Sequence, residues 1–219
     1  MLKTEELLDL SHTIAAELFE GKEYPWEVLG ELRDFILKLG ETLPENEFDK
    51  IAEDVWIARD ATVFPSAYIG GPCIIDRGAE IRHCAFIRGS AIVGKGCVVG
   101  NSVEIKNSLL FDMVQTPHYN YVGDSVLGYK SHMGAGSITS NVKSDKSLVV
   151  VKNGDELIET GRKKFGAILG DGVEVGCNSV LNPGTVLGRR ASVYPTSSVR
   201  GVVPEDCIYK DRDDIVKRK

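Results

Sequence analysis

The chain has 219 residues, 42% of them hydrophobic, which suffices for one large domain or a smaller domain with an appendage. Its net charge of −6 excludes a general attraction to nucleic acid or anionic membranes, so an anionic ligand needs a local group of basic residues. The five cysteines form no Cys-x-x-Cys pair and fit a reducing compartment better than a disulfide framework. With no signal peptide and no long apolar run, we expect a cytoplasmic protein.

Residues 1–50 predict a helical cap and a linker. One amphipathic helix is expected over residues 4–20. A second is expected to begin at Pro25, which suits a first helical turn, and to continue to Leu39 with apolar residues at helical spacing. Two such helices do not make a domain, so we expect them to cover the open N-terminal end of the segment that follows. Residues 41–50 are polar and are expected to be a linker.

Residues 51–203 carry a period of six. Every sixth residue from Ile51 to Phe111 is aliphatic or aromatic, and the position four residues later is small or apolar. A helix repeats near 3.6 and a strand near 2, so neither explains this period. The pattern predicts a parallel β-helix built from hexapeptides, with residues 204–219 as a charged tail.

The period of six fails twice, over residues 112–121 and over residues 139–167, and returns after each break. Insertions in solenoids form loops, and such loops often bind ligands. Both segments are therefore predicted to be loop excursions that carry function.

Two basic residues have the spacing of stacked positions. If three hexads make one coil, residues 18 apart lie roughly 4.8 Å apart on one face. Arg88 and Lys106 have that spacing. Two cations so close repel each other unless an anion lies between or beside them, which would suit a phosphate. The alternative is two unrelated surface residues.

His118 lies in the first break, soon after Lys106, and is expected near the same edge. An imidazole can act as a general base at neutral pH, and Glu104 could orient it. The alternatives are an exposed histidine without a role and a surface carboxylate.

A second interpretation gives the histidines to a metal. His83, His118 and His132 could form a three-histidine site and make the protein a metal-dependent hydratase. Their spacings of 35 and 14 residues do not place all three at equivalent coil positions, so this interpretation is less favoured.

The aliphatic-Gly-x-x-small-x hexads resemble those of the hexapeptide-repeat acyltransferases. Three segments, 99–106, 118–124 and 133–141, are similar to the acetyltransferase half of the bifunctional N-acetylglucosamine-1-phosphate uridyltransferases. The resemblance covers roughly residues 80–212. It implies a mainly β fold, a left-handed parallel β-helix preceded by two N-terminal α-helices.

The resemblance also implies a role for each matching residue. His118 would accept a proton, supported by Glu104. The expected substrate contacts come from both breaks and the coils between them: Arg88, Lys106, Tyr121, His132 and Lys164. The expected contacts to acetyl-CoA come from later coils and the tail: Ala135, Asn141, Val142, Cys177, Pro195 and Arg212. His132, Cys177 and Pro195 differ from the family, which has Asn, Ser and Ala there.

By this resemblance the chain would be an acetyl-CoA-dependent N-acetyltransferase in UDP-N-acetylglucosamine biosynthesis. Its acceptor would be an amino-sugar 1-phosphate, derived from glucosamine, galactosamine or both. We expect a homotrimer that needs no metal and lacks the uridyltransferase domain, because no G-x-G-T-R-type loop occurs. His132 and the insertion over residues 147–162 leave a nucleotide-linked amino sugar open as the acceptor. A non-catalytic trimeric scaffold is the other alternative.

Overall fold

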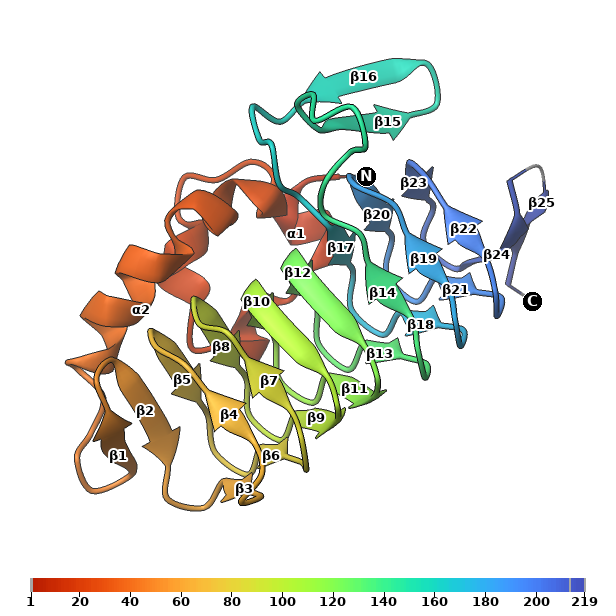
Figure 1. Cartoon of the computed structure of the whole chain (residues 1–219). Helices are drawn as coiled ribbons and strands as arrows, with labels where there is room; N and C mark the ends of the chain where they lie inside the picture. Colours follow the sequence, from red (N-terminus) through yellow and green to blue (C-terminus); the bar gives the residue numbers. More distant parts are fainter. Residues whose placement is uncertain (1, 213, 219) are drawn as a thin grey trace.

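The computed structural model describes residues 2–212 and 214–218 and confirms a left-handed parallel β-helix (Figure 1). Short strands stack coil upon coil into a three-sided prism, here given a front, a back and a lower face as seen in Figure 1. The front face holds β4 (Tyr68–Ile69), β7 (Phe86–Ile87), β14 (Ile138–Thr139), β19 (Val180–Leu181) and β22 (Ser198–Val199). Two longer strands, β10 (Glu104–Leu110) and β12 (Tyr121–Leu127), run from the front face onto the back face.

The other two faces repeat the arrangement. The back face holds β2 (Val55–Ala58), β5 (Cys73–Ile75), β8 (Ala91–Val93), β17 (Ala167–Leu169), β20 (Thr185–Leu187) and β23 (Val202–Val203). The lower face holds β3 (Thr62–Val63), β6 (Glu80–Ile81), β9 (Val98–Asn101), β11 (Gln115–His118), β13 (His132–Met133), β18 (Glu174–Val175), β21 (Ser192–Val193), β24 (Cys207–Asp211) and β25 (Asp214–Lys217). The last two form an antiparallel hairpin, so most of the predicted tail is strand.

The core consists of inward-facing columns, one from each face. On the back face, for example, Ile75, Val93, Leu110, Leu127, Leu169 and Leu187 pair in register and are all buried. Each coil alone would leave its aliphatic residue exposed, and stacking buries the whole column. The period of six in the sequence is thus the spacing from one face of the prism to the next.

The first break in the period is not a loop excursion. Residues 115–118 form β11, which pairs with β9 on one side and β13 on the other. Val99 pairs with Thr116, seventeen residues later, whereas Ile81 pairs with Val99, eighteen residues later. The coil is therefore one residue short at a corner. After this corner, a count of every sixth residue no longer lands on the inward-facing residues of the strands. The prediction of a loop excursion over residues 112–121 was therefore wrong.

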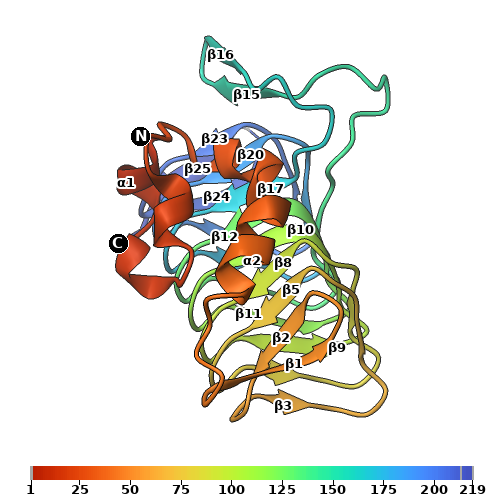
Figure 2. The same ribbon diagram turned by 90° about the vertical axis from the view of Figure 1, so that its left-hand side faces the viewer.

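The second break does leave the prism. Met133 pairs with Val175, forty-two residues later, so one coil contains a long insertion. Within it, β15 (Val150–Asn153) and β16 (Glu156–Glu159) form an antiparallel hairpin (Figures 1 and 2). Strand β15 contacts β20 and β23, and β16 lies farther out. Val149 and Val151 at the base of the hairpin are fully buried and fix it to the prism.

The N-terminal helices differ from the prediction. The helix expected over residues 4–20 is broken into α1 (Thr4–Leu7) and two 3₁₀ turns, η1 (Leu10–His12) and η2 (Ala16–Phe19). The backbone here bonds to the solenoid instead of to itself: Asp9 N–H donates to the Asp171 carboxylate, and Asp112 N–H donates to the His12 carbonyl. These tertiary bonds outweigh the helical period.

The second helical segment starts at Pro25 as predicted, but as the 3₁₀ helix η3 (Pro25–Gly30), followed by α2 (Leu32–Gly40). Both lie along the back of the prism, where α2 contacts β5, β8 and β10 and η3 contacts β12 (Figure 2). The prediction that these helices cover the N-terminal end of the solenoid was wrong. That end carries β1 (Phe48–Ala52), which pairs antiparallel with β2 and takes up part of the predicted linker. In the described part of the chain, no helix has the length and apolar character needed to cross a membrane.

Candidate functional site

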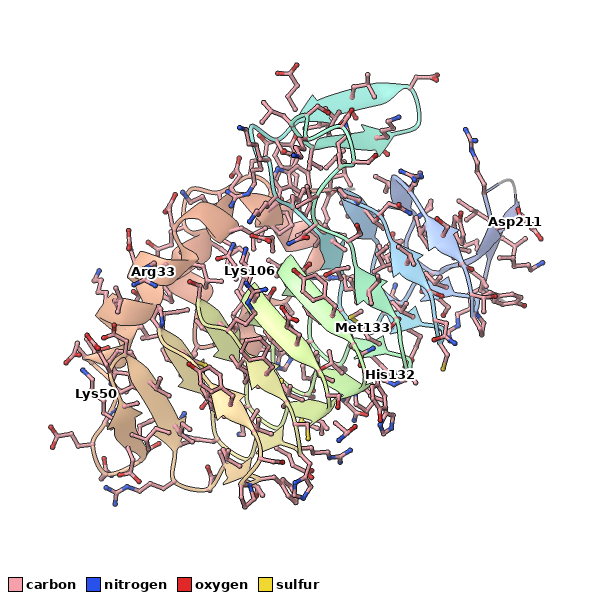
Figure 3. All side chains as sticks on the ribbon, viewed as in Figure 1. Arg33, Lys50, Lys106, His132, Met133 and Asp211 are labelled. Carbon is pink, nitrogen blue, oxygen red and sulfur yellow. The ribbon has the colours of Figure 1, made fainter. Side chains whose placement is uncertain are left out.

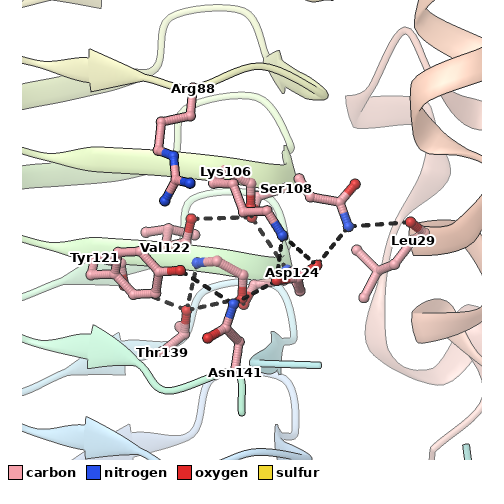
Figure 4. A network of polar contacts seen from close by, with 12 residues as sticks. Leu29, Arg88, Lys106, Ser108, Tyr121, Val122, Asp124, Thr139 and Asn141 are labelled. Atoms are coloured by element: carbon pink, nitrogen blue, oxygen red, sulfur yellow. Dashed lines mark hydrogen bonds and ion pairs between the residues drawn. The ribbon is translucent and has the colours of Figure 1, made fainter. Parts of the chain in front are cut away.

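Arg88 and Lys106 project from successive coils, as their spacing predicts. Ile87 of β7 pairs with Ile105 of β10, which places the residue after each at equivalent positions of two successive coils. Each cation has a carboxylate beside it: Arg88 Nη1 lies 2.7 Å from Glu104 Oε1, and Lys106 Nζ lies 3.0 Å from Asp124 Oδ2. These carboxylates relieve the repulsion between the two cations, an effect that was expected of a bound anion alone. Figure 4 shows the pair of Lys106 and Asp124.

Asp124 is the centre of this network and was missed by sequence reasoning. It is 3% exposed and accepts hydrogen bonds from Lys106, from Asn107 Nδ2 at 2.8 Å and from Asn141 Nδ2 at 2.5 Å. A buried carboxylate is stable only when paired and hydrogen-bonded. The available signal was its place in the otherwise uncharged stretch Tyr121–Leu127.

Tyr121 and Asn141 bring the two breaks in the period together. Asn141 Nδ2 also donates to Tyr121 Oη at 3.2 Å, although the two residues come from different coils. Burial raises the pKa of Tyr121, and the negative charges of Asp124 and Glu104 raise it further. The phenol is therefore a neutral hydrogen-bonding group at physiological pH. The resemblance assigned Asn141 to the coenzyme, and the structure places it against the predicted substrate residues.

His118 lies at the corner between the lower and front faces. Its carbonyl accepts the Gly136 N–H, the Ala135 carbonyl accepts the Asn178 N–H, and the Cys177 carbonyl accepts the Thr196 N–H. This ladder stacks four predicted site residues, His118, Ala135, Cys177 and Pro195, along one corner. Cys177 and Pro195 are exposed and Ala135 is half-buried, so the column forms an accessible edge.

The His118 side chain is exposed, and within residues 2–212 and 214–218 its imidazole makes no hydrogen bond or ion pair. The expected support from Glu104 is not formed, because that carboxylate bonds to Arg88 instead. An exposed imidazole without a partner keeps a ring nitrogen available to accept a proton.

His132 lies elsewhere. It sits on β13 of the lower face, with Nδ1 2.8 Å from Glu174 Oε2, and not among the residues around Lys106 (Figure 3). His83 Nδ1 bonds to Ser66 Oγ at 2.9 Å. No three His, Cys, Asp or Glu residues of the described chain are grouped to hold a metal ion, so the three-histidine site is not formed.

The remaining predicted residues lie toward the C-terminal coils. Lys164 and Val142 are exposed at the two ends of the insertion. Arg212 lines a cavity of about 410 Å³ together with Lys152 and Arg200, which sequence reasoning missed. None of the three cations has an ion pair among the described residues. A cavity with three free cations could hold a phosphate group of a coenzyme.

A family model described as the GMPPB C-terminal domain matches residues 69–208. A bifunctional sugar-1-phosphate nucleotidylyltransferase/acetyltransferase of Sulfurisphaera tokodaii is 36% identical over 150 residues, which are 68% of this chain and 37% of that protein. The bifunctional protein GlmU of Methanococcus maripaludis is 32% identical over 200 residues, 90% of this chain and 48% of the relative. The chain thus spans less than half the length of these relatives.

Among solved structures, the acetyltransferase domain of PglB from Neisseria gonorrhoeae, in complex with acetyl coenzyme A, is similar to this chain. The identity is 14% and the TM-score 0.33, over 86% of this chain and 67% of that one.

Proposed function

This chain belongs to the GMPPB C-terminal domain family, and from that premise we propose that it is an acetyl-CoA-dependent N-acetyltransferase acting on an amino-sugar 1-phosphate. The observation that carries the proposal is the position of Arg88, Lys106 and Tyr121 on consecutive coils of the front face, one corner away from the exposed His118. Cations and a phenol suit a sugar phosphate, and the imidazole suits its amine.

The proposed reaction begins with an amine that is mostly protonated at neutral pH. His118 takes one proton from the ammonium group, and the freed lone pair attacks the thioester carbonyl of acetyl-CoA. The new C–N bond forms as the C–S bond breaks, and the coenzyme leaves as a thiolate that takes up the second proton lost by the nitrogen. Both substrates are held together, so positioning supplies much of the acceleration and no acyl-enzyme is needed.

The coenzyme is proposed to run along the corner column of Ala135, Cys177 and Pro195. That column begins at His118 and continues toward the C-terminal coils, where Lys152, Arg200 and Arg212 surround the basic cavity. An anionic coenzyme could then place its thioester near His118 at one end of the column and its phosphates near these cations at the other end.

We further propose a homotrimer with sites between neighbouring copies. Tyr68 and Phe86 are 62% and 41% exposed beside Arg88 and line a cavity of about 540 Å³ on the front face. Aromatic surface of this kind favours contact with another protein. Sedimentation analysis tests this: a stable monomer at micromolar concentration would contradict shared sites.

A second acceptor class is favoured by the same two rings. The rings of Tyr68 and Phe86 meet edge to face with their centroids 5.6 Å apart, and the Arg88 guanidinium lies over the Phe86 ring. A nucleobase could stack there while its phosphates reach Arg88. An acceptor that is a nucleotide-linked amino sugar would use this arrangement.

One assay distinguishes the two acceptor classes from each other and from a non-catalytic scaffold. Thiol release from acetyl-CoA is measured with amino-sugar 1-phosphates, with the same sugars lacking phosphate, and with nucleotide-linked amino sugars. We expect the highest kcat/KM for a sugar 1-phosphate. A preference for the nucleotide-linked sugars would transfer the proposal to the second class, and no release with any acceptor would favour a non-catalytic scaffold.

A further inference from the structure

Arg162 is a half-buried cation without a partner among the described residues. It lies at the end of the insertion, and its backbone is bonded: its N–H donates to Thr160 Oγ1 at 3.2 Å and its carbonyl accepts the Val149 N–H at 2.8 Å. Its guanidinium makes no hydrogen bond or ion pair in the described part of the chain, and Nε is sealed from solvent. Five donors of one group are thus left unused.

The Arg162 guanidinium lies against η3, whose Leu29 carbonyl is hydrogen-bonded into the network around Asp124. A Cβ at Gly30 of η3 would lie 3.1 Å from Arg162 Nη1, so the guanidinium packs directly on that backbone. The neighbouring Leu29 carbonyl accepts a hydrogen bond from Asn107, which also bonds to Asp124. Of the three nitrogens only Nε is both sealed and unbonded, so the two terminal nitrogens remain open to solvent.

The charges around Asp124 do not balance. Glu104 is paired with Arg88, and Asp124 is paired with Lys106, which leaves Arg162 as an extra cation. Burial lowers the pKa of Arg162 and the charge of Asp124 raises it, but the two groups form no ion pair. A half-buried guanidinium with a sealed, unbonded Nε carries a desolvation cost, and a bound anion would offset that cost.

We propose that Arg162 binds the phosphate group of the acceptor, as a third cation beside Arg88 and Lys106. This rests on the proposed acceptor class and adds a residue from the insertion to the site. The guanidinium presents paired N–H donors that match two phosphate oxygens. Because Glu104 and Asp124 already neutralise the other two cations, Arg162 supplies the net positive charge that a phosphate needs.

The test removes the charge and keeps the bulk. Arg162→Met retains an unbranched side chain over Gly30, and Lys163→Met is the matched control because Lys163 is the adjacent exposed cation. Arg162→Met should raise KM for the sugar 1-phosphate about 10- to 100-fold, the usual effect of losing a charged hydrogen-bonding partner. KM for the sugar without phosphate should change less than about twofold, and Lys163→Met should leave both values unchanged. Equal changes for the two acceptors would overturn the proposal.

A second measurement does not depend on catalysis. Inorganic phosphate should raise the melting temperature of the parent and of Lys163→Met, but not that of Arg162→Met. Without phosphate, Arg162→Met should melt at or above the parent temperature, because the uncompensated charge is gone. If phosphate stabilises the parent and Arg162→Met equally, or stabilises neither, the anion site is refuted. If no amino sugar is acetylated while the phosphate effect still requires Arg162, the anion site stands and only the acceptor assignment fails.

Discussion

Residues 112–121 and residues 139–167 both interrupt the same period of six, yet they are built in opposite ways. The first segment stays inside the prism as a coil one residue short, with Val114 and Thr116 buried and β11 paired on both sides. The second leaves the prism as a hairpin and returns at β17. A period can therefore fail because one residue is missing or because many are added.

The two segments also contribute to the site differently. The short coil presents His118 and Tyr121 directly from the ladder, where backbone hydrogen bonds fix them. The insertion reaches the network around Asp124 through its two ends, Asn141 at the start and Arg162 at the finish, while Lys152 of its hairpin lines the basic cavity. The hairpin itself stands away from that network (Figure 1). The rigid solenoid thus holds His118 and Tyr121, whereas Asn141 and Arg162 are held where the insertion joins the solenoid.

The largest effect is expected in the short coil. His118→Ala should lower kcat roughly 10²–10⁴-fold, the usual contribution of a positioned general base. The melting temperature should stay near that of the parent, because the side chain is exposed and the ladder uses only the backbone. A fully active His118→Ala protein with normal melting would remove His118 from the mechanism.

The next effect tests the core column of the back face, which the chain rejoins after the short coil. Leu127 ends β12 and is fully buried between Leu110 and Leu169. Leu127→Ala should lower the free energy of unfolding by about 2–5 kcal/mol, because it leaves a cavity in a stacked column. Chemical denaturation measures this. A loss under about 1 kcal/mol would mean that the stacked column tolerates gaps.

A smaller effect is expected at the seam where the insertion rejoins the prism. Ser125 Oγ accepts the Ala167 N–H at 3.0 Å and donates to the Gly123 carbonyl at 2.8 Å, and it is fully buried. Ser125→Ala should cost about 1–3 kcal/mol of stability, because the amide loses its acceptor away from water. Ser192→Ala is the control, since that half-buried hydroxyl makes no hydrogen bond within the described residues. Similar losses in both variants would show that the seam has no special role.

The smallest effect is expected at the hairpin. Leu157 on β16 is 64% exposed, so Leu157→Ala should change stability by no more than about 0.5 kcal/mol. It differs from Leu127→Ala only in location, which makes the two a matched pair. A large loss at Leu157 would show that the hairpin packs against another surface in solution, such as a second copy of the chain.

Much of the site could be predicted from spacing. The positions of Arg88 and Lys106 follow from a coil of eighteen residues, and the structure places them as expected. Asp124 and Arg162 could not be found in this way. Their importance comes from burial and from the charges they meet, and those neighbours are distant in sequence.

The N-terminal segment marks the same limit. Its apolar residues predict helices, but Asp9 and His12 give their backbone groups to coils more than ninety residues away. The spacing of apolar residues within one segment cannot reveal such distant partners. The first helix and the location of both helical segments were therefore predicted wrongly.

The sequence by itself determined the β-helix, because a period of six is a local property that each coil repeats and that stacking then buries. The tertiary structure alone decided which break stays in the ladder, which carboxylate neutralises which cation, and that Arg162 has no partner among the described residues. These outcomes depend on the number of residues at one corner of the prism. They also depend on contacts between the coils, the insertion and the helical segment. Burial and electrostatic pairing act through space, so only the packed chain fixes them.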